Sequence, residues 1–337
     1  MRLQPHRSAA LTYDRPVNAR SDVAAVQSAT GVLMVRPARF AHNVQTSGTN
    51  RFQQPAVQPD QASVLASAEF DALSSAVAGC GVAVCCVDDT PAPAKPDAAF
   101  PNNWVSFHRD GSVVLYPMMA PNRRSERRAD ILAQVEARLK FQRQRLIDLS
   151  LHEREGRFLE GTGSLVLDHV HRIAYACRSP RTDESLVRTW SQQLGYEPLL
   201  FDASGADGTA IYHTNVMLSI GAGWAVVCTE AIASGDRARV LQQLRAGREV
   251  IEISMPLMAR FGANILELRA SARTVDGARL LVMSAQAQAA FEHSDPDAWE
   301  RLRDCVDQVL AVPVPTIENV GGGGVRCMLA EVPETTM

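Results

Sequence analysis

Long apolar runs, a strong net charge and paired cysteine motifs are all missing from this sequence of 337 residues. No apolar run approaches the roughly 18 residues that a membrane-spanning helix needs, so we expect no membrane partner. The formal net charge is −3 with acidic and basic residues interspersed, and this pattern indicates no nucleic-acid partner. Residues 1–30 contain no compact apolar region that would make a secretory signal.

The seven cysteines are an odd number and none has the Cys-x-x-Cys spacing. Most lie in apolar runs such as 82–87, which is typical of reduced, buried thiols in a cytoplasmic protein. His169-Val170-His171 has a spacing that could suit a metal, but no thiolate or acidic cluster accompanies it. We therefore expect a cytoplasmic protein with neither a metal nor another cofactor.

Composition indicates an ordinary globular chain, with 46% hydrophobic and 21% charged residues. The length allows one large domain or two smaller ones. We expect a disordered extension over residues 1–30, a single catalytic domain over 31–332 and a short tail over 333–337.

Apolar patterning predicts a recurring unit of strand, strand, helix and strand about every 50–60 residues. Expected strands include 31–36, 82–87 and the hairpins 104–107/113–116 and 164–167/173–177. Later strands are expected at 199–201, 215–220, 224–228, 249–254, 265–268, 280–284, 312–314 and 327–331. Helices are expected over 61–79, 123–149 (the longest), 183–194 (closed by Gly195), 236–247 and 296–309. Hairpins that alternate with helices favour an α/β fold built as an array or propeller.

Four glycines, 321–324, stand three residues before Cys327. Glycine tolerates positive φ and close approach, so this turn could present the cysteine as a nucleophile. The run could instead be a flexible linker, and Cys327 could be one more buried thiol. No Gly-Lys-Ser/Thr follows, which excludes a Walker phosphate loop.

Three other loops carry unusual polar residues: Asn102-Asn103, Glu160 beside Gly161, and His213 before an apolar strand. Each has an ordinary interpretation, as turn residues, a solvated acid and a buried core histidine respectively. A thiolate nucleophile needs a general acid/base and groups that orient the substrate. If the four loops converge, these residues supply all of them.

The motifs resemble the guanidine-modifying enzyme (pentein) superfamily, over about residues 32–332. Phe158-Leu159-Glu160-Gly161 is similar to its acidic motif, and His213-Thr214-Asn215 to its His-x-Asp motif. The glycine run with Arg326-Cys327-Met328 is similar to its nucleophile motif. The branch that the chain resembles most is the citrulline-utilization hydrolases, through 34–37, 100–104, 117–124 and 161–164. The resemblance implies a five-bladed, pseudo-fivefold α/β propeller with the site at its centre.

The resemblance also implies roles for individual residues. Cys327 would be the nucleophile, His213 the general acid/base and Glu160 its acidic partner. Arg123 and Arg181 would bind the carboxylate of an amino-acid substrate, and Asp97 its ammonium group. The remaining substrate-binding residues would be Asn102, Asn103, Asn215 and Gly324, the last through the backbone amides of the glycine turn.

Asn103 and Asn215 stand where deiminases usually carry aspartates that grip a cationic guanidinium. An amide offers a donor and an acceptor but no charge, which suits a neutral ureido group. We therefore predict hydrolysis of citrulline to ornithine, ammonia and carbon dioxide. The alternatives are a deiminase-like or amidinotransferase activity on an arginine-type guanidine, and a non-catalytic binding protein on the same propeller. The sequence leaves a homo-oligomer open.

Overall fold

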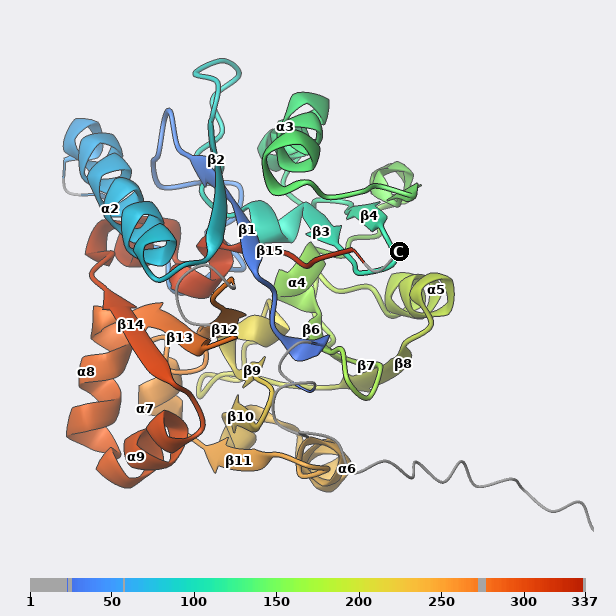
Figure 1. Ribbon diagram of the computed structural model, residues 1–337, viewed down its shortest axis with the longest axis vertical. Helices are drawn as coiled ribbons and strands as arrows, with labels where there is room; N and C mark the ends of the chain where they lie inside the picture. The colour runs from blue at the N-terminus through green and yellow to red at the C-terminus, as the bar shows by residue number, and fades with distance from the viewer. Residues whose placement is uncertain (1–22, 24–25, 57, 272–276, 336–337) are drawn as a thin grey trace, which may run out of the picture.

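We describe the protein from a computed structural model, which covers residues 23, 26–56, 58–271 and 277–335. Small sheets surround a centre and helices lie outside them (Figure 1). Within these residues there are five three-stranded sheets. The predicted pseudo-fivefold α/β propeller is confirmed.

Every sheet repeats one topology. Its middle strand is antiparallel to the inner strand and parallel to the outer strand, as β4 is to β3 and β5. The strands, in order inner, middle and outer, are β15 (Ala330–Val332), β1 (Gly31–Arg36), β2 (Ala83–Asp88); β3 (Val105–Phe107), β4 (Ser112–Leu115), β5 (Arg145–Asp148); β6 (Val166–Asp168), β7 (Ile173–Cys177), β8 (Glu197–Phe201); β9 (Leu218–Ile220), β10 (Trp224–Val227), β11 (Glu249–Glu252); and β12 (Leu266–Arg269), β13 (Arg279–Ser284), β14 (Gln308–Val312).

The first sheet joins the two ends of the domain. Its inner strand β15 comes from the C-terminal end and pairs antiparallel with β1, with Gly31 opposite Val332. This pairing closes the ring, and the segment that carries Cys327 leads directly into the strand that pairs with β1.

The longer helices each connect a middle strand to its parallel outer strand. They are α2 (Pro59–Gly79), α3 (Ala129–Leu139), α5 (Glu184–Leu194), α6 (Ser234–Leu244), and the pair α8 (Ala285–Ser294) and α9 (Pro296–Asp304); α4 (Gly161–Ser164) and α7 (Met255–Met258) are single turns. Local signals explain several ends: the Asp183 side chain caps α5, and Gly195 with φ +69° ends it as predicted.

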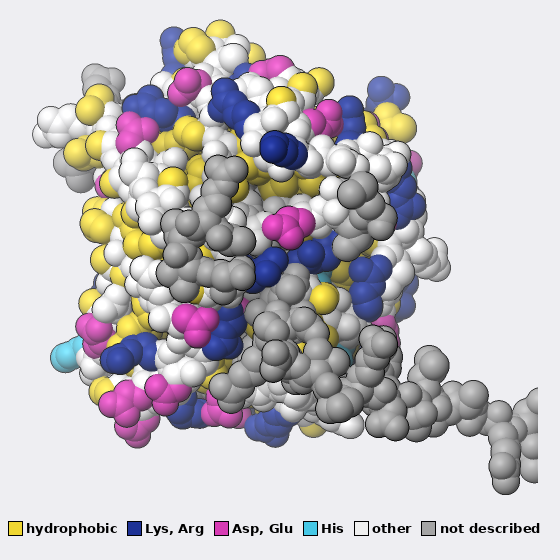
Figure 2. All heavy atoms as spheres, in the orientation of Figure 1, with side chains coloured by type: hydrophobic (Ala, Val, Ile, Leu, Met, Phe, Trp, Pro, Cys, Tyr) yellow, Lys and Arg dark blue, Asp and Glu magenta, His cyan; other side chains and the backbone are white. Residues whose placement is uncertain are grey.

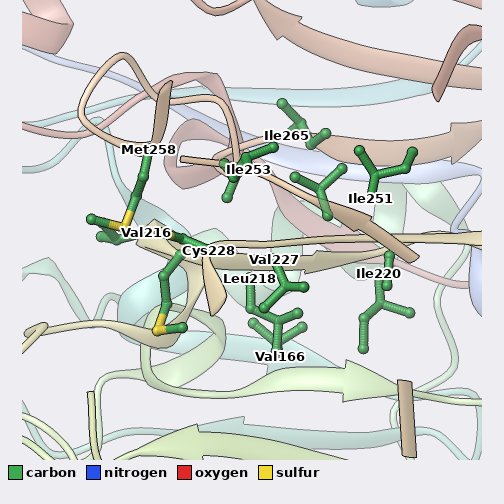
Figure 3. Close-up of a cluster of buried hydrophobic side chains, with 14 of the residues drawn as sticks. Val166, Val216, Leu218, Ile220, Val227, Cys228, Ile251, Ile253, Met258 and Ile265 are labelled. Carbon is green, nitrogen blue, oxygen red and sulfur yellow. The ribbon is translucent and has the colours of Figure 1, made fainter. Parts of the chain in front are cut away.

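The core lies between neighbouring sheets. In Figure 3, apolar side chains of β6, β9, β10 and β11 meet, among them Val166, Leu218, Val227 and Ile251. All four residues of β10 are buried, which explains why its sequence is continuously apolar. Cys228 lies in the same cluster, and all seven cysteines are free thiols, four of them buried.

One predicted helix is wrong. Residues 123–149 form the 3-10 helix η2 (Pro121–Glu126), then α3, and then strand β5. Lys140 stops α3 in the left-handed conformation at φ 55°, and 145–148 then pairs with β4. The longest helix in the described part is α2. The helix predicted over 296–309 is also shorter than expected, because α9 ends at Asp304 and β14 begins at Gln308.

The expected extension over 1–30 is partly outside the described residues, which omit 1–22 and 24–25. For 26–30 the expectation of disorder is wrong, since Gln27 and Ser28 are buried and bonded to Leu167 and Glu267. The last two residues of the expected tail also lie outside the described part.

On the face drawn in Figure 2, basic and acidic side chains of the described residues are interspersed. No helix in the described part is long and apolar enough to cross a membrane.

Candidate active site

A polar segment precedes the inner strand of every sheet. These segments are η1 (Pro101–Asn103) before β3, Glu160 with α4 before β6, His213 with η4 (Thr214–Val216) before β9, Asn264 before β12, and η7 (Val325–Met328) before β15. Within the ring η1 contacts both η7 and α4, and α4 contacts η4. Pseudo-fivefold symmetry thus brings the four predicted loops, and a fifth, to one end of the axis.

The glycine run is packed in the interior, so its interpretation as a flexible linker is wrong. All four glycines are buried, and Gly322 has φ +64°. A Cβ on Gly321 would lie 2.8 Å from the Phe100 ring, and one on Gly324 would lie 2.7 Å from Asn264 Oδ1. Glycine is therefore needed for Phe100 and Asn264 to approach the backbone this closely. The run leads directly into η7, which carries Cys327 immediately before β15.

Cys327 is 5% exposed and lies among amide groups. The Nδ2 atoms of Asn264 and Asn215 lie 3.4 and 3.7 Å from its sulfur. Burial raises the pKa of this thiol, although the hydrogen bonds from the two amides act in the opposite direction. The thiol of Cys327 is therefore protonated at neutral pH.

Glu160, His213 and Arg181 form a buried ionic cluster. Glu160 Oε2 lies 2.9 Å from His213 Nε2 and 3.3 Å from Arg181 Nη1. Burial opposes ionisation of Glu160, but the Arg181 charge and the His213 hydrogen bond hold its pKa well below the usual value. Burial lowers the pKa of His213 to about 4 despite the carboxylate. The imidazole is therefore neutral, with Nε2–H donating to Glu160 and Nδ1 free to accept a proton.

Arg123 orients a chain of two asparagine amides. Its guanidinium donates to both carboxylate oxygens of Glu126 at 2.9 Å and, through Nη1, to Asn103 Oδ1 at 2.8 Å. Asn103 Nδ2 in turn donates to Asn102 Oδ1 at 3.1 Å. An arginine can only donate, so it fixes which way the Asn103 amide faces, and Asn103 then fixes Asn102. Arg123 is thus already engaged with protein acceptors, and its predicted contact with a substrate carboxylate stays a prediction.

Three of the predicted binding residues have a buried polar atom with no partner among the described residues. They are Asp97 Oδ1, Asn102 Nδ2 and Asn215 Oδ1. Buried polar atoms in folded proteins are nearly always hydrogen-bonded, so this group of two acceptors and one donor indicates a place for a polar ligand.

The segment 37–56 lies over the groups predicted to bind an amino acid. Asn43 and Thr46 donate to Asp97 Oδ2 at 2.8 and 3.2 Å, and Arg181 donates to Thr46 O at 2.9 Å. Farther along, Gln53 Nε2 donates to Gly321 O at 2.9 Å. These contacts connect the segment to both the groups predicted to bind a ligand and the glycine turn.

Asn264 was missed from the sequence. Motif matching drew attention to four loops, whereas the fold has five units, and the segment before β12 carries Asn264 two residues ahead of the strand. The repeat itself was the signal, because a fifth polar residue should precede the strand predicted at 265–268.

Metal-ligand groups are absent from the described part of the chain, where no three His, Cys, Asp or Glu residues could hold an ion together. His169 and His171 have other partners, the Tyr196 hydroxyl at 2.6 Å and Asp168 at 2.8 Å.

The neutral state of His213 gives a prediction for stability. A histidine whose folded-state pKa lies below its unfolded value of 6.5 binds fewer protons when folded, so its contribution is lost as pH falls from 6.5 to about 4. Relative to His213→Asn, wild type should lose up to about 3 kcal/mol of unfolding free energy over this range, measured by urea denaturation. A gain of wild type over the variant on acidification would instead show an imidazolium–carboxylate pair.

Comparison with known proteins gives the family and the fold that this chain resembles. The sequence model of the family described as N,N dimethylarginine dimethylhydrolase, eukaryotic, matches residues 36–334. No protein with a curated description matches the chain.

Solved structures share the fold at low sequence identity. The N-terminal domain of ArgZ, an arginine dihydrolase from the ornithine–ammonia cycle in Cyanobacteria, has a TM-score of 0.68 and 15% identity, covering 91% of this chain and 99% of that one. Unliganded AgrE has a TM-score of 0.68 and 18% identity, covering 91% of this chain and 40% of that one. A dimethylarginine dimethylaminohydrolase adduct has a TM-score of 0.60 and 15% identity, covering 90% and 99%.

Proposed function

Because this chain belongs to the N,N dimethylarginine dimethylhydrolase family of the pentein superfamily, we propose that it is a cysteine-dependent hydrolase of C–N bonds with citrulline as its substrate. The proposal has two parts: the reaction, which uses Cys327, His213 and Glu160, and the choice of a ureido group, which rests on the asparagines.

One observation carries the choice of a ureido group. The chain of amides from Arg123 through Asn103 leaves Asn102 Nδ2 as a buried donor without a partner. A guanidinium has only N–H donors, so it could not satisfy this atom, whereas a ureido carbonyl oxygen could. Leaving a buried donor unpaired costs about 1–3 kcal/mol, which favours the ureido ligand by roughly 10- to 100-fold.

The reaction follows from the protonation states. Neutral His213 accepts the Cys327 proton, directly or through water, and the sulfur attacks the ureido carbon. The oxyanion lies near the backbone amides of the glycine turn that ends at Gly324. The imidazolium, stabilised by Glu160, then gives its proton to the δ-nitrogen of ornithine as the C–N bond breaks. Water, deprotonated by His213, cleaves the carbamoyl thioester, and the carbamate decays to ammonia and carbon dioxide.

Three charged groups are candidates for binding the amino-acid end of citrulline. Arg181 is bonded to Thr46 and Thr49 of the segment 37–56, and a substrate carboxylate could replace these neutral acceptors. Arg123 is the weaker candidate, since it would have to leave the bidentate Glu126. Asp97, with one free oxygen, would take the ammonium group.

An arginine-type guanidine is the second candidate substrate. The unpaired acceptors Asp97 Oδ1 and Asn215 Oδ1 favour it, because a guanidinium offers five N–H donors. ArgZ is described as an arginine dihydrolase. Incubation of the pure protein with citrulline or arginine separately, with ornithine and ammonia measured, distinguishes the two. Conversion of arginine to citrulline, with citrulline itself untouched, would refute the ureido assignment.

Asn102→Asp is the sharpest variant for this choice. The new carboxylate keeps the contact with Asn103 but replaces the unpaired donor by a charged acceptor. We expect kcat/KM for citrulline to fall about 100-fold and arginine to be favoured relative to wild type. The matched control is Asn319→Asp, which adds the same charge at an exposed position and should leave kcat/KM unchanged. Equal citrulline kinetics in wild type and Asn102→Asp would contradict the proposed donor.

A further inference from the structure

Asn264 makes direct contact with the sulfur of Cys327. Its Nδ2 lies 3.4 Å from Sγ and its Oδ1 lies 3.6 Å away. The same Nδ2 donates to the backbone oxygen of Asn215 at 3.1 Å, and the side chain is only 2% exposed. The amide therefore joins the segment that carries His213 to the segment that carries the nucleophile.

The backbone before Asn264 is held in an unusual conformation. Phe261 is a non-glycine residue with φ 63°, a strained left-handed conformation that residues other than glycine rarely adopt. Asn264 N donates to Phe261 O at 2.9 Å, so this turn sets the direction in which the chain leaves toward β12. Such strain is retained where the surrounding structure needs one particular orientation, here that of the Asn264 amide.

The glycine run is shaped around this amide. A Cβ on residue 324 would lie 2.7 Å from Asn264 Oδ1, closer than real Cβ atoms come to other atoms. Gly324 thus provides the space in which the Asn264 side chain reaches the sulfur. The glycine run and the segment that carries Asn264, which are far apart in the sequence, are thus complementary in shape at this point.

One cation acts on the sulfur: the charge of Arg326 lowers the pKa of the Cys327 thiol, and the Asn264 hydrogen bond acts in the same direction. His213 is bonded to Glu160, and the guanidinium of Arg326 is bonded to Glu331 at 2.9 Å. The side-chain donors that reach Sγ, within the described residues, are the amides of Asn264 and Asn215. A cationic guanidinium would itself stabilise a thiolate, but a neutral ureido group brings no positive charge. With such a substrate, the thiolate is stabilised by these two amides together with the charge of Arg326.

We propose that Asn264 is a positioning residue for Cys327: its Oδ1 receives the S–H of the resting thiol, and its NH₂ group holds the thiolate for attack. This inference rests on the proposed function only in taking Cys327 as the nucleophile. It does not depend on which substrate the protein uses.

The test measures the thiol in the free protein. The rate at which iodoacetamide alkylates Cys327 is followed against pH by mass spectrometry of the peptide that contains it. Asn264→Ala should move the midpoint upward by about one pH unit, the size expected for one lost hydrogen bond to a charged group. Asn264→Asp, nearly isosteric, should move it further because a carboxylate repels the thiolate. This second variant keeps the test valid if alanine prevents folding.

Asn50→Ala is the matched control. Asn50 Nδ2 donates to the backbone oxygens of Gly321 and Gly322 but does not contact the sulfur. The pH midpoint of Cys327 alkylation in Asn50→Ala should equal that of wild type. A wild-type midpoint in both Asn264 variants would overturn the proposal, and so would an equal shift in Asn50→Ala, since general loosening of the turn would then explain it. Failure of citrulline turnover would leave this result standing and refute only the ureido assignment.

Discussion

Cys327→Ala is expected to lose all measurable hydrolysis, with kcat reduced by roughly 10⁴-fold or more. The reason is that, among the described cysteines, Cys327 is the one whose sulfur contacts the amides of Asn264 and Asn215. Binding of the substrate should survive, because the atoms assigned to it belong to other residues. Turnover is measured as ornithine release and binding by calorimetry.

Cys228→Ala is the control for removing a buried thiol. Cys228 lies in the apolar cluster of Figure 3, outside the site. This variant should lose some stability and keep its kcat. Turnover by Cys327→Ala at a tenth of the wild-type rate would show that the sulfur is not the nucleophile.

Glu160→Gln is expected to lower kcat by about 10²–10⁴-fold and also to destabilise the fold. The carboxylate pairs with His213 and Arg181 and accepts from Met119 N at 3.1 Å, all in the interior. Removing its charge leaves Arg181 buried beside a neutral amide and removes the group that stabilises the imidazolium. Breaking a buried pair in this way costs about 3–5 kcal/mol. Urea denaturation and steady-state kinetics measure the two effects.

Asp168→Asn separates stability from catalysis. Asp168 makes a buried bidentate pair with Arg248, with both distances 2.7 Å, away from the proposed site. The Asp168→Asn variant should lose about as much unfolding free energy as Glu160→Gln and should keep the wild-type kcat. If Glu160→Gln lost stability but kept full kcat, Glu160 would be only a structural acid.

The apolar rhythm of the sequence predicted a repeating α/β array or propeller, and the family resemblance implied its five blades. The strand at 224–228 and the hairpin 164–167/173–177 were clear local signals. The prediction from sequence failed where charged and apolar residues have helical spacing but part of the segment forms a strand. Residues 123–149 have charged and apolar residues at helical spacing, yet the parallel pairing of 145–148 with β4 prevails over that local preference. The end of the helix predicted over 296–309 was placed too late for the same reason.

Motifs predicted which residues lie near the centre but not how they are connected. Cys327, His213 and Glu160 belong to loops that the topology brings together, and the structure places them so. The role of Arg123 in orienting Asn103 is a contact across twenty residues that no motif encodes. Asn264 lacked a motif altogether and emerges only when the five inner strands are compared.

The most direct measurement uses citrulline labelled at the ureido carbon. After rapid acid quench, the peptide that contains Cys327 should carry the label as a carbamoyl group, with ornithine released in equal amount and no label on Cys327→Ala. Absence of label from citrulline, with the same peptide labelled by arginine carrying the label at its guanidino carbon, would contradict a site built around a neutral ureido group.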